Sequence, residues 1–208
     1  MRLHEPRVWE QIAKVLLPKD YLRLWLTGDY VAEMSDAAGT SWLDTGKRDW
    51  SDDCLQATGL TRAQMPRLVE GAEVSGQLRD VLAERWRLPK SVIVAGGGGD
   101  NAAAAVGVGV VRAGEALVSL GTSGVLFAAN DRYQPAAETA VHSFCHAVPN
   151  TWHQMGVILS ASDALNWYGN FVGQDAQMLT QELGVLKPPT KTAFLPYLGG
   201  ERTPLNSA

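Results

Sequence analysis

Four consecutive glycines at 96–99 constrain the fold of this 208-residue chain more than any other feature. The apolar segment 91–95 before them has the pattern of a short buried strand, and the alanine-rich segment 101–111 after them has the pattern of a helix. Glycine lets the backbone turn sharply and approach a ligand closely. A strand, a glycine turn and a helix in this order predict an α/β fold with a candidate site at the turn.

Asp100 and Asn101 follow the glycines directly, at the expected start of the helix. Free N–H groups and the helix dipole favour the ionised form of a carboxyl group at that position. An ionised carboxylate at the mouth of a glycine turn can orient a hydroxyl group and take its proton, which in phosphoryl transfer is largely a matter of positioning. An aspartate that only caps the helix fits the same pattern, so both interpretations stay open.

The glycine run also allows a dinucleotide site. Gly97, Gly99 and Ala102 satisfy the G-x-G-x-x-A pattern between a strand and a helix. That fingerprint needs an acidic residue about 20 positions further on, at the end of the next strand. Residues 120–123 at that place read Leu-Gly-Thr-Ser, so this alternative is weaker.

A second turn, residues 121–124, joins strand patterns at 116–120 and 125–129. Its successive N–H groups, with the hydroxyls of Thr122 and Ser123, would form a concave site for a phosphate group. An ordinary hairpin turn uses the same residue types, and that interpretation stays open as well. No G-x-x-x-x-G-K-[ST] motif occurs, so the turn is not a P-loop.

The first 90 residues are expected to be mainly helical. Apolar spacing predicts a helix over 7–17 and a second over 18–28, closed by Gly28. Apolar residues cover most of the second helix, so deep burial is expected for it. Further helices are expected after Ser51, acting as N-cap, and from Thr61.

Near Pro89 the apolar period changes from helical to strand-like, which predicts a domain boundary there. Beyond it, strands are expected at 152–159 and 193–198, with a helix between them that Ser160 or Ser162 caps. Three strands, a helix and a further strand are typical of the start of a ribonuclease-H-like domain.

Composition excludes several classes of function. The hydrophobic share of 46% and the charged share of 19% are ordinary for a soluble globular protein. A net charge of −4 without a Lys/Arg block gives no support for a nucleic-acid or acidic-membrane partner. Apolar runs end before about 18 residues and the first residues lack a signal-peptide core, so no membrane span and a cytoplasmic protein are expected.

Two further groups of polar residues are not expected to form sites. His142, Cys145, His146 and His153 are metal-binding residue types. In a strand, His142 and His146 would share one face while Cys145 points to the other, so no metal site is expected. Residues 201–204 have the pattern of a solvated polar turn.

The two glycine motifs together, in the order strand–GGGGDNAAAAVG–helix–LVSLGTSGV, resemble those of the FGGY family of carbohydrate kinases. The segments VLLPKDYLRLWLTG, MSDAAGTSWLD, KRDWSD, AVHSFCHAVP and FLPYLGGERTP are also similar, and they span nearly the whole chain. Within the family, the similarity is greatest to members that phosphorylate D-xylulose.

This resemblance implies an actin-like, ribonuclease-H-like ATPase fold that binds ATP, Mg²⁺ and a sugar between two domains. Residues 1–88 would be the distal part of the N-terminal domain, and 89–208 would be the proximal half of the C-terminal domain. It further implies transfer of the ATP γ-phosphoryl group to a pentulose. Because family members are more than twice as long, little or no activity is expected from this chain alone.

The resemblance also implies roles for single residues. Asp100 would be the catalytic base that takes the proton of the D-xylulose 5-hydroxyl, and Asn101 would hold another sugar hydroxyl. Gly121, Thr122 and Ser123 would lie against the ATP phosphates, with Thr122 contacting the γ-phosphate. The alternatives are a non-catalytic kinase-fold module that interacts with partners or with itself, another sugar kinase of the family, and a dinucleotide-binding protein.

Overall fold

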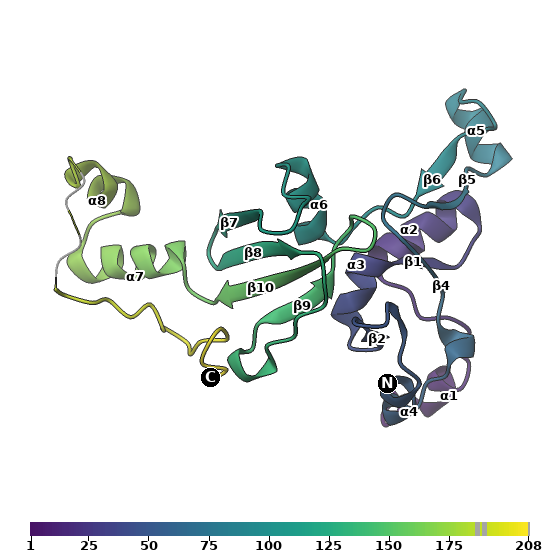
Figure 1. Ribbon diagram of the computed structural model, residues 1–208, viewed down its shortest axis with the longest axis horizontal. Coiled ribbons are helices and arrows are strands. Elements are labelled where there is room, and N and C mark those ends of the chain that lie inside the picture. The colour runs from purple at the N-terminus through teal and green to yellow at the C-terminus, as the bar shows by residue number, and fades with distance from the viewer. Residues whose placement is uncertain (186–187, 189–190, 208) are drawn as a thin grey trace.

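The largest sheet has four antiparallel strands in the order β7-β8-β10-β9 and lies in the middle of an elongated molecule (Figure 1). Its strands are β7 (Ala116–Leu120), β8 (Gly124–Asn130), β9 (His142–Cys145) and β10 (Trp152–Ile158). The computed structural model describes residues 1–185, 188 and 191–207. The predicted hairpin of β7 and β8 is confirmed, with Leu120 paired to Gly124 at its turn.

Three smaller sheets have two strands each. They pair β1 (Val31–Glu33) with β4 (Arg67–Val69) in parallel, and β2 (Leu43–Asp44) with β3 (Asp49–Trp50) and β5 (Val74–Gln77) with β6 (Ile93–Ala95) in antiparallel fashion. Strand β6 therefore continues a sheet that begins before residue 88, although it follows the expected domain boundary. The boundary at 88 stays a prediction.

Eight α-helices lie in the described ranges. They are α1 (Pro6–Trp9), α2 (Pro18–Thr27), α3 (Met34–Ala37), α4 (Asp52–Thr58), α5 (Asp80–Trp86), α6 (Asp100–Gly107), α7 (Ser162–Val172) and α8 (Ala176–Glu182). As predicted, Gly28 ends α2 in the left-handed region, at φ 88°. Ser51 caps α4 as predicted, because its side-chain oxygen accepts a hydrogen bond from the Cys54 N–H at 3.3 Å. None of the helices in this part of the chain is long and apolar enough to cross a membrane.

Helix α6 packs on one face of the four-stranded sheet. Alternate residues of β8, Phe127 and Ala129, are buried against Ala105 of α6 and Val110 beyond it. The strand period of two supplies one apolar face, and the small alanine side chains allow the helix to approach closely. This contact connects the element that follows the glycine turn to the central sheet.

Two helix predictions in the first half are wrong. Helix α1 ends at Trp9 rather than near residue 17, and the Val15 N–H donates to the Gln64 carbonyl at 2.9 Å. The helix expected from Thr61 is only a 3₁₀ turn, Arg62–Gln64, after which β4 pairs with β1. In both places a hydrogen bond to a distant segment replaces the local helical pattern.

The burial predicted for α2 and for segment 91–95 is also wrong. Tyr21, Leu22 and Trp25 are exposed, whereas the charged side chains of Asp20 and Arg23 are buried. The face of α2 that carries Asp20 and Arg23 is directed at the glycine turn. There Arg23 donates to the Gly96 carbonyl, and Asp20 pairs with Lys19 and Arg23. Strand β6 is shorter than the predicted segment 91–95, and its first residue, Ile93, is 60% exposed.

Three predictions in the second half fail as well. Neither Ser160 nor Ser162 caps α7, because Ala161 occupies the N-cap position and the Ser162 hydroxyl donates to the Gly121 carbonyl. Segment 193–198 forms no strand beyond an isolated bridge between its last residue and Gly200. Glu201 is buried rather than solvated, because its carboxylate accepts hydrogen bonds from backbone N–H groups.

Candidate functional site

The glycine turn 96–99 connects β6 to α6 and requires glycine at two positions in particular. Gly97 has φ +84°, in the left-handed region that residues with a Cβ rarely adopt. A Cβ on Gly96 would collide with the carbonyl oxygen of Glu70. The turn is therefore both bent and packed against the neighbouring backbone.

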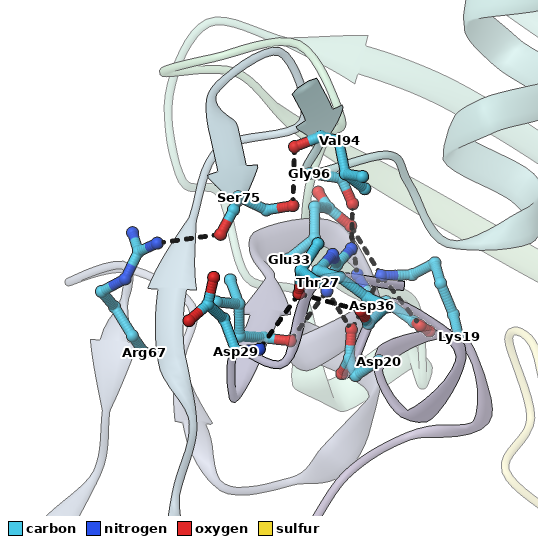
Figure 2. Close-up of polar contacts among 12 residues, drawn as sticks. Lys19, Asp20, Thr27, Asp29, Glu33, Asp36, Arg67, Ser75, Val94 and Gly96 are labelled. Carbon is cyan, nitrogen blue, oxygen red and sulfur yellow. Dashed lines mark hydrogen bonds and ion pairs between the residues drawn. The ribbon is translucent and has the colours of Figure 1, made fainter. Parts of the chain in front are cut away.

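The beginning of the turn is anchored by Arg23 of α2. The Arg23 guanidinium donates to the Gly96 carbonyl, and also to Asp20 Oδ1 and the Val31 carbonyl at 2.7 Å each. Figure 2 shows the group of charged side chains around Gly96. Because both side chains of the Asp20–Arg23 pair are buried, this anchor is held in a water-poor setting.

The end of the turn is anchored by Ser35 of α3. The Gly99 N–H donates to Ser35 Oγ at 2.9 Å, and the Ser35 hydroxyl donates to Glu33 Oε2 at 2.8 Å. Glu33 is buried and caps α3, since its carboxylate also accepts the N–H groups of Ser35 and Asp36. Burial raises the pKa of the Glu33 carboxyl, and the hydrogen bonds from Ser35 and the charge of Lys19 oppose that rise.

Lys19 lies among three carboxylates below the turn (Figure 2). Its Nζ is 3.1 Å from Asp20, 3.5 Å from Asp36 and 3.9 Å from Glu33. Burial raises the pKa of Asp36, Lys19 lowers it, and the charges of Asp20 and Asp100 raise it further. Asp36, beneath the turn, is therefore electrostatically coupled to the carboxylate of Asp100.

Asp100 is the first residue of α6, as the sequence predicts, and its side chain is exposed. Its Oδ1 accepts the Asn101 N–H at 2.7 Å and the Asn101 Nδ2 amide at 3.1 Å. Within the described ranges Oδ2 has no hydrogen-bond partner. One carboxylate oxygen is thus held in place while the other is available to a ligand hydroxyl.

In the second turn the Gly121 N–H donates to the Ser123 carbonyl at 2.9 Å, and the donors of Thr122 and Ser123 stay available. The Gly121 carbonyl accepts from the Ser162 N–H at 3.0 Å, and the Thr122 carbonyl accepts from the Ala161 N–H at 2.8 Å. Among described residues, neither the N–H groups nor the hydroxyls of Thr122 and Ser123 donate a hydrogen bond. Exposed, uncommitted donors at a turn fit a phosphate group.

The predicted site residues lie in two separate groups. Asp100 and Asn101 lie beside α3, whereas the turn 121–123 lies against the start of α7, beyond the other end of the central sheet (Figure 1). No hydrogen bond or ion pair joins the two groups in the part of the chain that the structure describes. A ligand that contacts both must therefore span the distance between α6 and the hairpin.

The histidines near β9 and β10 fill the core between the sheet and the segment after α6. His153 stacks on Phe127 with ring centroids 4.1 Å apart, and the His146 ring nitrogens pair with the Val110 carbonyl and the Val148 N–H. Within the described ranges, no group of three or more His, Cys, Asp or Glu side chains could hold a metal ion.

Sequence reasoning missed the side chains that anchor the glycine turn. Arg23, Glu33 and Ser35 lie far from the turn in sequence, with a separation of 73 residues from Arg23 to Gly96 and of 64 from Ser35 to Gly99. Glu33, a carboxylate within the apolar residues 31–34 and two residues before Ser35, is the signal that could have drawn attention to these two residues. It identifies a cap but not the segment that the serine contacts.

The fold is that of a family of sugar kinases. The model of the N-terminal domain of the FGGY family of carbohydrate kinases matches residues 1–107, and the chain belongs to this family. The predicted family and the predicted α/β, actin-like fold are thereby confirmed, since the similar solved structures are sugar kinases of this family.

Among individual proteins, the chain is similar to xylulose kinases. It is 52% identical over 206 residues to the xylulose kinase of Escherichia coli (strain K12), covering 98% of this chain and 42% of that protein. A crystal structure of a xyloylose kinase from Brucella ovis has a TM-score of 0.96 and 63% identity, covering 100% of this chain and 43% of that one. The xylulose kinase structure from Rhodospirillum rubrum has a TM-score of 0.86 and 25% identity, with 97% and 42% covered. The chain thus spans less than half of the length of these relatives.

Proposed function

We propose that the chain is part of an ATP-dependent kinase that phosphorylates the 5-hydroxyl of a pentulose, D-xylulose. The observation that carries the proposal is Asp100, held by Asn101 through one oxygen at the start of α6 and left with the other oxygen uncommitted. The similarity to xylulose kinases supports the choice of sugar.

In the proposed reaction the sugar hydroxyl attacks the γ-phosphorus of ATP. The new bond joins the sugar oxygen to phosphorus, the bond to the β-phosphate oxygen breaks, and ADP leaves. Asp100 takes the hydroxyl proton, and Asn101 holds a second sugar hydroxyl. Little covalent work falls to the protein, because phosphoryl transfer depends mainly on alignment and charge stabilisation.

Gly121, Thr122 and Ser123 would bind the ATP phosphates. The uncommitted N–H and hydroxyl donors of Thr122 and Ser123 suit phosphate oxygens, and the carbonyls of Gly121 and Thr122 are already bonded to the start of α7. Mg²⁺ would neutralise the phosphates, as it commonly does with few protein carboxylates. Phosphate oxygens of ATP and water molecules would together supply most of its ligands.

A chimera tests this proposal. The 208 residues would replace the matching region of the E. coli xylulose kinase, to which they are 52% identical. We expect the chimera to phosphorylate D-xylulose and the Asp100→Asn variant to lose at least about 100-fold in kcat, as expected for removal of a general base. Asp131→Asn, an exposed carboxylate on a turn, is the control that should keep full activity.

Two results would contradict the proposal. If the chimera is active and Asp100→Asn leaves its kcat unchanged, Asp100 is not the catalytic base. A chimera that folds but is inactive would favour the non-catalytic interaction module. The 208-residue chain by itself is expected to show little or no turnover, and ATP-dependent phosphorylation of D-xylulose by that chain would contradict this expectation.

A further inference from the structure

The hydroxyl of Ser35 connects a buried carboxylate to the last glycine of the turn. The Gly99 N–H can only donate, so Ser35 Oγ must accept there, at 2.9 Å. The single hydroxyl proton of Ser35 is then free to go to Glu33 Oε2, at 2.8 Å. The Gly99 N–H thus determines the direction of the first hydrogen bond, and the second runs from the Ser35 hydroxyl to the Glu33 carboxylate.

Glu33 is itself held firmly. It is the last residue of β1, where it pairs with Val69 of β4, and its side chain is buried. Its carboxylate accepts the Ser35 N–H at 2.8 Å and the Asp36 N–H at 3.2 Å. A group with that many partners has little freedom, so the hydrogen bonds from Glu33 through Ser35 to Gly99 form a rigid link.

The link ends one residue before Asp100. Gly99 is the N-cap of α6, and its carbonyl accepts the Ala103 N–H at 2.8 Å. A Cβ on Gly99 would lie 3.4 Å from Asp36 Cα, so the backbone here already touches α3. Any shift of Gly99 moves the backbone of Asp100 directly, and misplacement by about 1 Å can cost a catalytic group about 100-fold in rate.

We propose that Ser35 is a positioning residue for Asp100, and that it acts by fixing the Gly99 N–H through the buried Glu33 carboxylate. The inference rests on the proposed function, because it gives Ser35 a role only through the base. It assigns no contact between Ser35 and the substrate.

Ser75 provides a matched control (Figure 2). It is also a buried serine, and its hydroxyl donates to the Val94 carbonyl at 2.8 Å and the Ala95 carbonyl at 3.2 Å. Those carbonyls belong to β6, which leads into the same glycine turn. Ser75→Ala therefore removes a comparable hydrogen bond near the site and leaves the Gly99 N–H with its partner.

Kinetics of the chimera give the first test. Ser35→Ala is expected to lower kcat by about 10-fold to 100-fold and to change KM for D-xylulose and ATP less than about twofold. Ser75→Ala should keep kcat within about threefold of the parent. Equal losses of kcat in the two alanine variants would show a general loss of stability and overturn the inference.

Ser35→Thr keeps the hydroxyl and is expected to retain kcat within about threefold. If Ser35→Ala does not fold, Ser35→Thr still provides a test of the hydroxyl. A folded Thr variant that retains Gly99 protection and loses kcat as severely as Asp100→Asn would overturn the role given to the hydroxyl.

Amide hydrogen exchange of Gly99 in the 208-residue chain gives a test that needs no activity. Ser35→Ala should speed this exchange at least about tenfold, and Ser75→Ala should not. Unchanged exchange of Gly99 in Ser35→Ala overturns the link. If exchange rises as expected but the chimera keeps its rate in Asp100→Asn, the link stands as structure while the proposed function, and with it the positioning role, fails.

Discussion

Arg23 Nη1 lies 2.7 Å from Asp20 Oδ1, and both side chains are buried although Tyr21, Leu22 and Trp25 of the same helix are exposed. Helix α2 is thus turned with its charged face inward. The reason lies in the partners of Arg23, which include the carbonyl of Gly96 at the start of the glycine turn. Arg23 therefore connects α2 to the turn while it pairs with Asp20 inside the helix.

Loss of Arg23 is expected to destabilise the chain strongly. Arg23→Met keeps most of the volume but leaves the buried Asp20 carboxylate with Lys19 as its remaining cationic partner among the described residues, so the free energy of unfolding should fall by about 3 kcal/mol. Lys47→Met removes the exposed pair with Asp44 and should cost less than about 0.5 kcal/mol. Urea unfolding measures both, and equal effects would contradict the anchor.

The pKa of Asp36 is expected to respond to Lys19. The Lys19 charge lowers the pKa of Asp36, 3.5 Å away, against the rise that burial causes. Lys19→Met should therefore raise the pKa of Asp36 further, and Asp100→Asn should lower it by removing a like charge. Carboxyl carbon chemical shifts followed with pH would report both directions, and shifts of the same sign would contradict the proposed coupling.

Stability should fall in mild acid because of His153. Burial, with smaller contributions from His146 and His142, lowers the pKa of His153 to about 3, from 6.5. The unfolded chain then binds a proton that the folded chain does not, so stability is lost as pH falls below 6.5, by up to about 1.4 kcal/mol per pH unit, until about pH 3. His153→Leu should flatten this slope in unfolding measured at successive pH values. An unchanged slope would mean that other groups cause it.

Substitution of Glu201 is expected to destabilise the turn 201–204, which the sequence pattern predicted to be solvated but in which Glu201 is buried. Its Oε1 accepts the Leu159 N–H at 3.0 Å and the Arg202 N–H at 2.8 Å. Glu201→Ala leaves both donors without this acceptor and should lower the free energy of unfolding by about 2 kcal/mol. Glu201→Gln keeps an acceptor and should protect the Leu159 amide from exchange nearly as well. A Gln variant as unstable as the Ala variant would show that the charge, not the acceptor, is needed.

Features that depend on neighbouring residues were predictable from the sequence. The β7–β8 hairpin and the start of α4 after Ser51 follow from turn and capping chemistry that acts within a few residues. Asp100 at the start of α6 follows from the glycine turn in the same way. The local part of the candidate site therefore follows from the order of residues along the chain.

Features that depend on distant partners were not predictable. The expected helix over 7–17 is interrupted where Val15 bonds to Gln64, and the buried face of α2 is the charged one because Arg23 reaches Gly96. Apolar periodicity carries no information about either contact. For the same reason the residues that hold the glycine turn were missed, although the segment MSDAAGTSWLD that contains Ser35 is similar to the family.

The two anchors of the glycine turn also limit where this chain can be recombined with a relative. Arg23 and Ser35 lie on one side of a crossover placed anywhere between residues 36 and 95, and the glycines they hold lie on the other side. A hybrid of this chain and a diverged relative with its crossover in that interval would take the glycine turn and Asp100 from one parent and their supports from the other. Crossovers before residue 23 or after residue 100 keep them together, and functional hybrids should be enriched there.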